Sequence, residues 1–219
     1  SAYIIGVGIA LRWIIPWLDA ELQAASGFDV GPYLPVGVSY FVLVNASVLT
    51  GMVGGFLLLE QREERTIKAF LVTPTPLGVN LGVLSGLVLV SGAALSIVEG
   101  LIVGHGVPDL VPLVVSSVLC APTGLMMGLV LATVADNKVE AFAVMKITSA
   151  FGIVPVVAWF LPMPLQYVAG VLPPYWACRI WWVAAEGSAD WTWMVVPAVL
   201  TSAGWLAWLG QRFQTAVRR

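Results

Sequence analysis

The chain has 219 residues, of which 59% are hydrophobic and 10% are charged, and its formal net charge is −2. Soluble domains carry about 25% charged residues, so this composition excludes a soluble globular domain. The nearly neutral charge argues against a nucleic-acid partner. We therefore predict an integral membrane protein surrounded by a lipid bilayer.

Six apolar runs are long enough for transmembrane helices, which need about 20 residues each. In chain order they cover residues 2–18, 35–59, 77–103, 110–135, 142–161 and 191–211. The runs are continuous and do not alternate in polarity, which favours helices over the strands of a barrel. The predicted fold is an all-α membrane protein with six transmembrane helices in a single domain, residues 1–219. Ser1 lies within an apolar run without an initiator Met, so we expect a segment before it and do not interpret this run as a signal peptide.

Two charged residues lie inside predicted spans, where a charge is costly and usually has a structural or functional reason. Arg12 is in the first span and Glu99 is late in the third, at a similar depth in the outer half of the membrane. We predict that they form an intramembrane ion pair. Such a pair could fix the packing of the two helices or line a transport path.

The second span carries no charge but contains four polar residues that form a candidate substrate path: Ser39, Asn45, Ser47 and Thr50. Polar groups in membrane helices also bond to neighbouring helices, and this alternative stays open. Small residues repeat at four-residue spacing in several spans, for example Gly51 with Gly55 and Gly124 with Gly128. This spacing allows close helix packing, within one chain or between two chains.

The loop after the second span holds the highest local density of charge, with six charged residues between Glu60 and Lys68. Ile67, Phe70 and Leu71 follow at helical spacing, and Pro74 and Pro76 end the pattern. The loop therefore predicts a short amphipathic helix at the membrane surface. This helix either lies among the lipid headgroups or docks a cytoplasmic partner.

Residues 162–190 do not form a span, because four prolines interrupt the segment. Residues 175–185 are typical of a tryptophan-rich helix that is too short to cross the membrane. We predict a re-entrant or interfacial helix between the fifth and sixth spans. It could shape an exit or cap the bundle.

The basic residues predict the orientation, since cytoplasmic loops are enriched in Lys and Arg. One side of the predicted bundle holds eight of the ten: Arg62, Arg65, Lys68, Lys138, Lys146, Arg212, Arg218 and Arg219. This side is predicted to be cytoplasmic, together with both termini. We interpret most of the tryptophans as anchors in the membrane interfaces. Trp205 and Trp208 are assigned to the inner interface, and eight are assigned to the outer one: Trp13, Trp17, Trp159, Trp176, Trp181, Trp182, Trp191 and Trp193.

The sequence contains none of the common catalytic or nucleotide-binding motifs considered for a membrane enzyme. The sequence lacks a His-Glu-x-x-His zinc motif, a Gly-x-Ser-x-Gly elbow and a Gly-x-x-x-x-Gly-Lys-Ser/Thr phosphate loop, and its single His105 excludes a site with two histidines. We predict no catalytic residue, no metal site and no cofactor on this chain. The role of Cys120 and Cys178 is left open.

The loop Glu60…Glu63-Glu64-Arg65-Thr66-Ile67…Leu71-Val72-Thr73-Pro74 resembles the signature loop of type-2 ATP-binding-cassette (ABC) exporter permeases. The six spans and the broken helix before the last one agree with that family, although Arg65 replaces its common glycine. The Glu-Arg-Thr form is similar to actinobacterial drug-export permeases, including those of the fluoroquinolone type.

The resemblance implies that the loop forms a coupling helix, which docks on a separate nucleotide-binding ATPase subunit carrying ATP and Mg. Its residues would be Glu60, Arg62, Glu63, Glu64, Arg65, Thr66, Lys68, Phe70 and Leu71. It also implies two permease chains, identical or homologous, in a bacterial plasma membrane. The substrate, a lipophilic or amphipathic drug, natural product or lipid, would pass near the second and fifth spans. The alternatives are a stand-alone channel or proton-coupled carrier using Glu99, and an intramembrane enzyme or assembly factor.

Overall fold

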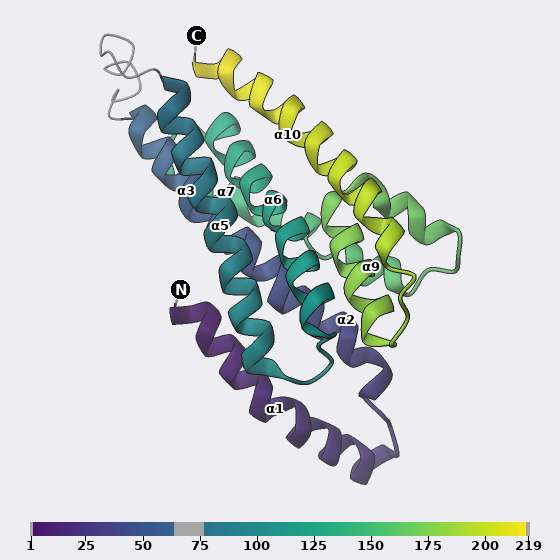
Figure 1. Cartoon of the computed structure of the whole chain (residues 1–219). Helices are drawn as coiled ribbons and strands as arrows, with labels where there is room; N and C mark the ends of the chain where they lie inside the picture. Colours follow the sequence, from purple (N-terminus) through teal and green to yellow (C-terminus); the bar gives the residue numbers. More distant parts are fainter. Residues whose placement is uncertain (1, 64–76, 218–219) are drawn as a thin grey trace.

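The computed structural model describes residues 2–63 and 77–217, and this part contains helices and no strand. The helical elements, in chain order, are α1 (Ala2–Ser26), η1 (Gly31–Tyr33), α2 (Leu34–Ser39), η2 (Tyr40–Asn45), α3 (Ala46–Glu63), α5 (Leu77–Val103), α6 (Leu110–Val134), α7 (Lys138–Phe151), α8 (Val154–Trp159), η3 (Leu165–Val171), α9 (Pro173–Ala185), η4 (Thr192–Met194) and α10 (Val195–Val217). Figure 1 shows the bundle that they form.

Within the described residues, six helices or helical runs are long and apolar enough to cross a membrane, as predicted. They are Ala2–Ser26, Gly31–Gln61, Leu81–Val103, Leu110–Val134, Lys138–Trp159 and Thr192–Phe213. The second run joins α2, η2 and α3, and the fifth joins α7 and α8. The all-α membrane fold is therefore confirmed.

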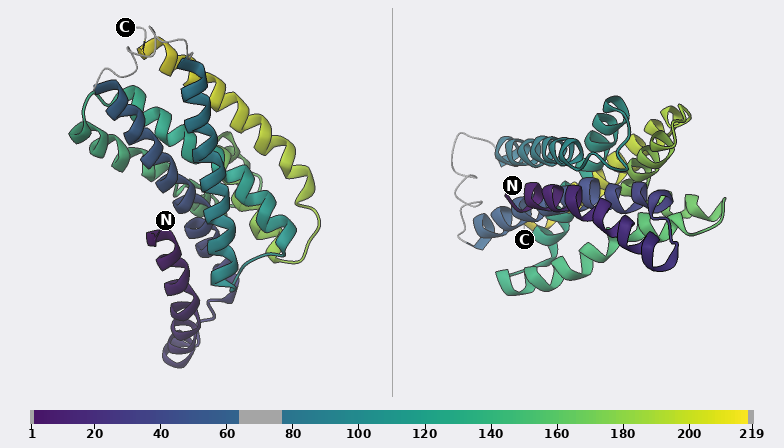
Figure 2. Two further views of the ribbon diagram at one scale, coloured as in Figure 1. Left: turned by 60° about the vertical axis from the view of Figure 1, so that its left-hand side comes forward. Right: turned by 90° about the horizontal axis from the view of Figure 1, so that it is seen from below.

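The central helix is α6, which packs against α3, α5, α7, α9 and α10. By contrast, α1 packs mainly along α5 and extends from the lower end of the bundle (Figures 1 and 2). The end of α3 and the end of α10 lie together at the opposite end, near the start of α7 (Figure 1). The ends of α3 and α10 and the start of α7 carry charged residues that the sequence assigned to the cytoplasmic side. Which side of the membrane this end faces stays a prediction.

The first helix is longer than the predicted span, since it continues to Ser26. Asp19 and Glu21 therefore belong to a helix and not to a loop. The Asp19 carboxylate accepts a hydrogen bond from the backbone N–H of Val30 at 3.3 Å. This contact ties the end of α1 to the segment that turns back into the second span.

Glycines place α3 directly against α6. A Cβ atom added to Gly55 would lie 2.8 Å from the Gly128 Cα, and one added to Gly128 would lie 2.5 Å from the Gly51 carbonyl oxygen. Real side chains do not fit at such distances, so the two backbones touch. The four-residue glycine spacing in these helices thus serves packing within one chain.

The segment between the fifth and sixth spans is re-entrant. η3 ends at Val171 and α9 begins at Pro173; the Val171 carbonyl accepts a hydrogen bond from Trp205, in the middle of α10. The turn between η3 and α9 therefore reaches the middle of the last span, which confirms the re-entrant form of the prediction.

The interpretation of the outer tryptophans as mostly membrane anchors does not hold for those of α9. Trp176, Trp181 and Trp182 are 8%, 0% and 2% exposed and belong to the largest hydrophobic core. Ten of the 13 residues of α9 are buried, because α6, α10 and α2 surround it. Trp13 and Trp17 are 73% and 62% exposed, as an anchor in the interface requires.

Candidate functional site

The end of α3 is joined to the start of α7 by an ion pair. Lys138 Nζ lies 2.8 Å from a carboxylate oxygen of Glu60. The start of α7 is itself fixed by capping, because the Asn137 side chain accepts a bond from the Glu140 N–H at 2.9 Å and Glu140 accepts one from the Asp136 N–H. Lys138 is thus held where it meets the last turns of α3.

An apolar groove of about 330 Å³ runs beside this ion pair, between α3 and α7. Its walls are Val53, Phe56 and Leu57 of α3 and Phe142 of α7, and Glu60 and Lys138 close one end. The rings of Phe56 and Phe142 lie 5.2 Å apart between centroids. The groove offers aromatic surface with one ionic end, which suits an amphipathic molecule. The sequence predicted Glu60 as a site residue but not Lys138, because the contact between them depends on how α3 and α7 pack.

Of the predicted coupling residues, Glu60, Arg62 and Glu63 form the last turn of α3. Glu64, Arg65, Thr66, Lys68, Phe70 and Leu71 lie outside the described residues. The amphipathic coupling helix therefore stays a prediction. The described part does show that the segment begins directly beside the Glu60–Lys138 ion pair.

The candidate path residues of the second span do not line one common cavity among those found in the described chain. Ser39 is fully buried; it donates to the Val36 carbonyl at 2.9 Å and accepts a bond from the Trp182 indole at 2.8 Å. Thr50 donates to the Ser47 carbonyl within its own helix, and Ser47 is buried. Asn45 is partly exposed at the end of η2. Ser39 thus bonds a neighbouring helix, which was the alternative for these groups.

The second span also contains a feature that the sequence did not reveal. Residues Tyr40–Asn45 form one turn of π-helix between α2 and α3. Such turns break the regular hydrogen-bond ladder inside a longer helix and often occur at functional sites. Nothing in the residue pattern signalled it, because the flanking residues are ordinary membrane-helix residues.

The predicted ion pair between Arg12 and Glu99 is wrong. The Arg12 guanidinium instead donates to the backbone carbonyl of Ile102 at 2.8 Å, and neither carboxylate oxygen of Glu99 has a hydrogen-bond partner within the described chain. Both residues do lie where α1 packs on α5. Arg12 of α1 bonds to α5, and Glu99 of α5 lies against α1, since a Cβ added to Gly8 would lie 3.0 Å from the Glu99 Cγ. Ile102 lies in the last turn of α5, where carbonyls lack helical partners, and this explains why Arg12 bonds there.

Comparisons with a family model and with curated proteins place the chain among known proteins. The family model described as "Fluoroquinolones export permease protein Rv2686c-like" matches residues 2–210. Two curated relatives, the fluoroquinolones export permease proteins Rv2686c and MT2760 of two Mycobacterium tuberculosis strains, are each 32% identical over 216 residues, covering 94% of this chain and 82% of the relative. No solved structure matches.

The family match covers the first five candidate spans and most of the sixth, and the relatives are export permeases by name. The resemblance to drug-export permeases is thereby confirmed, and the chain is a multi-pass membrane protein of a bacterial family. It belongs to the Rv2686c-like fluoroquinolone export permeases.

Proposed function

We propose that this chain is the membrane-spanning subunit of an ATP-driven ABC exporter that moves a lipophilic or amphipathic drug outward. The family match over residues 2–210 carries the proposal, because the named relatives are fluoroquinolone export permeases. The chain itself has no phosphate-binding loop. In this proposal a separate ATPase subunit supplies the nucleotide site, with ATP and Mg, and docks on residues 60–71.

The contact between α3 and α7 supports a route for the coupling. Closure of an ATPase dimer would move the segment that begins after Glu63. Because Glu60 bonds to Lys138, that movement would reach both the second and the fifth spans. ATP binding would shift the population between two packings of the bundle, as in other domain-level switches.

The groove between α3 and α7 is our candidate for the substrate path. Val53 and Phe142 are 63% and 54% exposed in the isolated chain, and a second permease chain facing them would enclose the groove. A planar aromatic drug would find the Phe56 and Phe142 rings there, with Glu60 and Lys138 for its charged groups. Asn45 and Thr50, which the sequence assigned to the path, belong to the same span but do not line this groove.

Co-purification with an ATPase and transport in vesicles test this function. Replacing Phe70 with Ala, or Glu64 with Arg, should abolish ATPase activity that depends on the permease while the chain still inserts. Glu21→Arg, an exposed charge reversal at the opposite end of the bundle, is the matched control and should retain coupling. Unchanged coupling in both docking variants would refute the docking role of the loop.

A second candidate is a carrier that works without an ATPase and uses Glu99. One observation favours it: Glu99 is 1% exposed and its carboxylate oxygens have no hydrogen-bond partner among the described residues. This candidate requires gradient-driven flux by the chain alone, abolished in Glu99→Gln. Flux that depends on ATP and survives Glu99→Gln would exclude it.

A further inference from the structure

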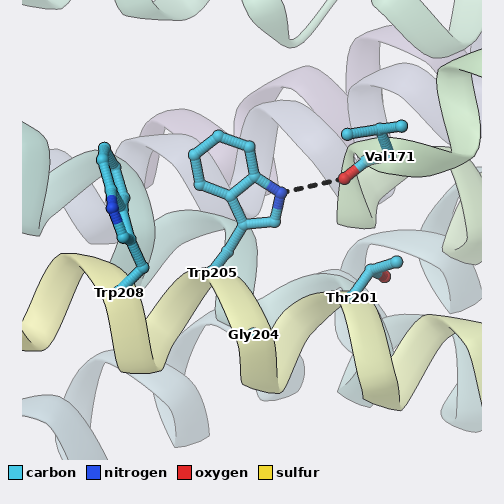
Figure 3. A pocket seen from close by; sticks show the side chains of 5 residues that line it. All are labelled: Val171, Thr201, Gly204, Trp205 and Trp208. Carbon is cyan, nitrogen blue, oxygen red and sulfur yellow. Dashed lines mark hydrogen bonds between the residues drawn. The ribbon is translucent and has the colours of Figure 1, made fainter.

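A second groove lies on the membrane-facing side of α10. It measures about 450 Å³ and is lined by Thr201, Gly204, Trp205 and Trp208 of α10 and by Val171 of η3 (Figure 3). The Thr201 hydroxyl is already bonded to the Pro197 carbonyl of its own helix at 2.8 Å. The groove therefore presents an almost entirely apolar surface.

A hydrogen bond joins the two sides of the groove, α10 and η3. The Trp205 indole N–H donates to the Val171 carbonyl at 2.9 Å, as Figure 3 shows. Non-helical backbone at membrane depth needs such a partner, since lipid offers none. Trp205 also borders a smaller apolar cavity of about 170 Å³, between α6, α7 and the start of α9. The indole thus separates two apolar spaces at the tip of the re-entrant segment.

The groove lies on a stripe of α10 that is about as long as one leaflet of a bilayer. Thr201, Trp205, Trp208 and Arg212 follow each other at spacings of four, three and four residues, so they form this stripe, with Gly204 beside it. The eleven steps from Thr201 to Arg212 rise about 17 Å at 1.5 Å each, and the groove lining from Thr201 to Trp208 covers about 10 Å of that length. Half of the hydrocarbon core is about 15 Å.

The stripe ends in a cation. The Arg212 guanidinium lies 5.5 Å from the centre of the Trp208 ring, and within the described chain it forms no ion pair with an acidic side chain. A cation one turn beyond an apolar groove is complementary to a phosphate group attached to an acyl chain. A drug would need polar groups to orient it, and the groove has none to offer.

We propose that this groove binds one phospholipid, with its phosphate on Arg212 and one acyl chain along Trp208 and Trp205 as far as Val171. The lipid comes from the leaflet at the Arg212 end of α10. It supports the re-entrant tip from the membrane side. The proposal does not depend on an ATPase partner or on the identity of the exported drug.

Two glycines of α10 provide a matched test. A Cβ atom has no neighbour within 4 Å at either Gly204 or Gly210, so a side chain can begin at both positions without a clash at its Cβ. Only Gly204 lines the groove. The purified chain in detergent is titrated with dioleoyl phosphatidylglycerol, and bound lipid is counted by native mass spectrometry. Gly204→Leu should weaken the tightest lipid site at least about tenfold, whereas Gly210→Leu should retain it.

The headgroup is tested by Arg212→Gln, a change at an exposed position. It should weaken the same site by roughly tenfold, since the phosphate loses a hydrogen bond to a charged group. Millimolar inorganic phosphate should not displace the lipid. If phosphate alone competes, Arg212 binds a free anion and the acyl-chain site is wrong.

Three further results would overturn the proposal. Equal lipid binding in wild type, Gly204→Leu and Gly210→Leu would mean that lipids only surround the protein. Displacement of the lipid by ciprofloxacin would assign the groove to the substrate path. A change of oligomeric state in Gly204→Leu without loss of lipid would assign it to a second chain. Arg212→Gln keeps the test decisive if Gly204→Leu does not fold.

Discussion

At the scale of single residues, indole N–H groups satisfy backbone carbonyls inside this bundle. Trp176 donates to the Gly170 carbonyl at 2.7 Å, Trp181 to the Gly106 carbonyl at 2.9 Å and Trp205 to the Val171 carbonyl at 2.9 Å. Each carbonyl belongs to a loop or to a short 3₁₀ segment, where the regular helical ladder is missing. An unsatisfied carbonyl in hydrocarbon costs several kcal/mol, so these tryptophans stabilise the irregular segments that a bilayer would otherwise disfavour.

Replacing Trp176 with Phe should therefore lower stability by about 1 kcal/mol or more, because the buried Gly170 carbonyl loses its donor. Trp13→Phe is the matched control, since Trp13 is 73% exposed. Thermal unfolding in detergent measures both variants. Equal melting temperatures for the two would show that the indole bond contributes nothing to stability.

Glu99 makes a different prediction, because it is a buried carboxylate whose oxygens have no hydrogen-bond partner in the described chain. A charge inside a span is costly, and Gln has nearly the same shape without that charge. Glu99→Gln should therefore unfold at the same temperature as wild type or at a higher one. A clear loss of thermal stability would reveal an ionic partner of Glu99.

At the scale of elements, the contact of α3 with α6 depends on glycines. Gly124→Val would push a side chain against the backbone of α3 at Ser47, and overpacking of this kind costs typically about 1–3 kcal/mol. Gly86→Val is the control, since a Cβ at Gly86 meets nothing within 4 Å. We expect Gly124→Val to reduce the yield of folded monodisperse protein in size-exclusion chromatography, and Gly86→Val to leave it unchanged.

The ion pair between α3 and α7 should affect coupling more than stability. Glu60 and Lys138 side chains are 44% and 54% exposed, and exposed pairs contribute about 0–1 kcal/mol. Under the proposed function, Lys138→Glu should reduce drug-stimulated ATPase activity with little change in melting temperature. The exchanged pair Glu60→Lys with Lys138→Glu should restore part of the activity. If the exchange restores nothing, the contact does not transmit the movement.

At the scale of the whole molecule, the predicted orientation can be measured by thiol labelling. Cys120 and Cys178 are buried, so the native thiols should remain unlabelled. Ala189 and Thr215 are exposed and lie at the two ends of the bundle, so each can be replaced by a cysteine for labelling. An impermeant maleimide should label Ala189→Cys in intact cells and Thr215→Cys only after permeabilisation. The reverse pattern would invert the topology.

The sequence by itself determined the membrane class, the six spans and the family, because these depend on long apolar runs and on a local motif. The Asn137–Glu140 capping contact also depends only on neighbouring residues. The short helix between the last two spans was also predicted, since prolines and a short apolar run reveal it without any knowledge of packing, but the sequence left open whether it is re-entrant or interfacial.

Only the tertiary structure decided which side chains meet. Arg12 bonds a helix-end carbonyl and not Glu99, and three tryptophans of α9 are core residues and not interface anchors. In a membrane chain both lipid-facing and core positions are apolar, so hydropathy cannot separate them. The partners of the polar groups depend on helix rotation and depth, which are set by contacts between residues far apart in the chain.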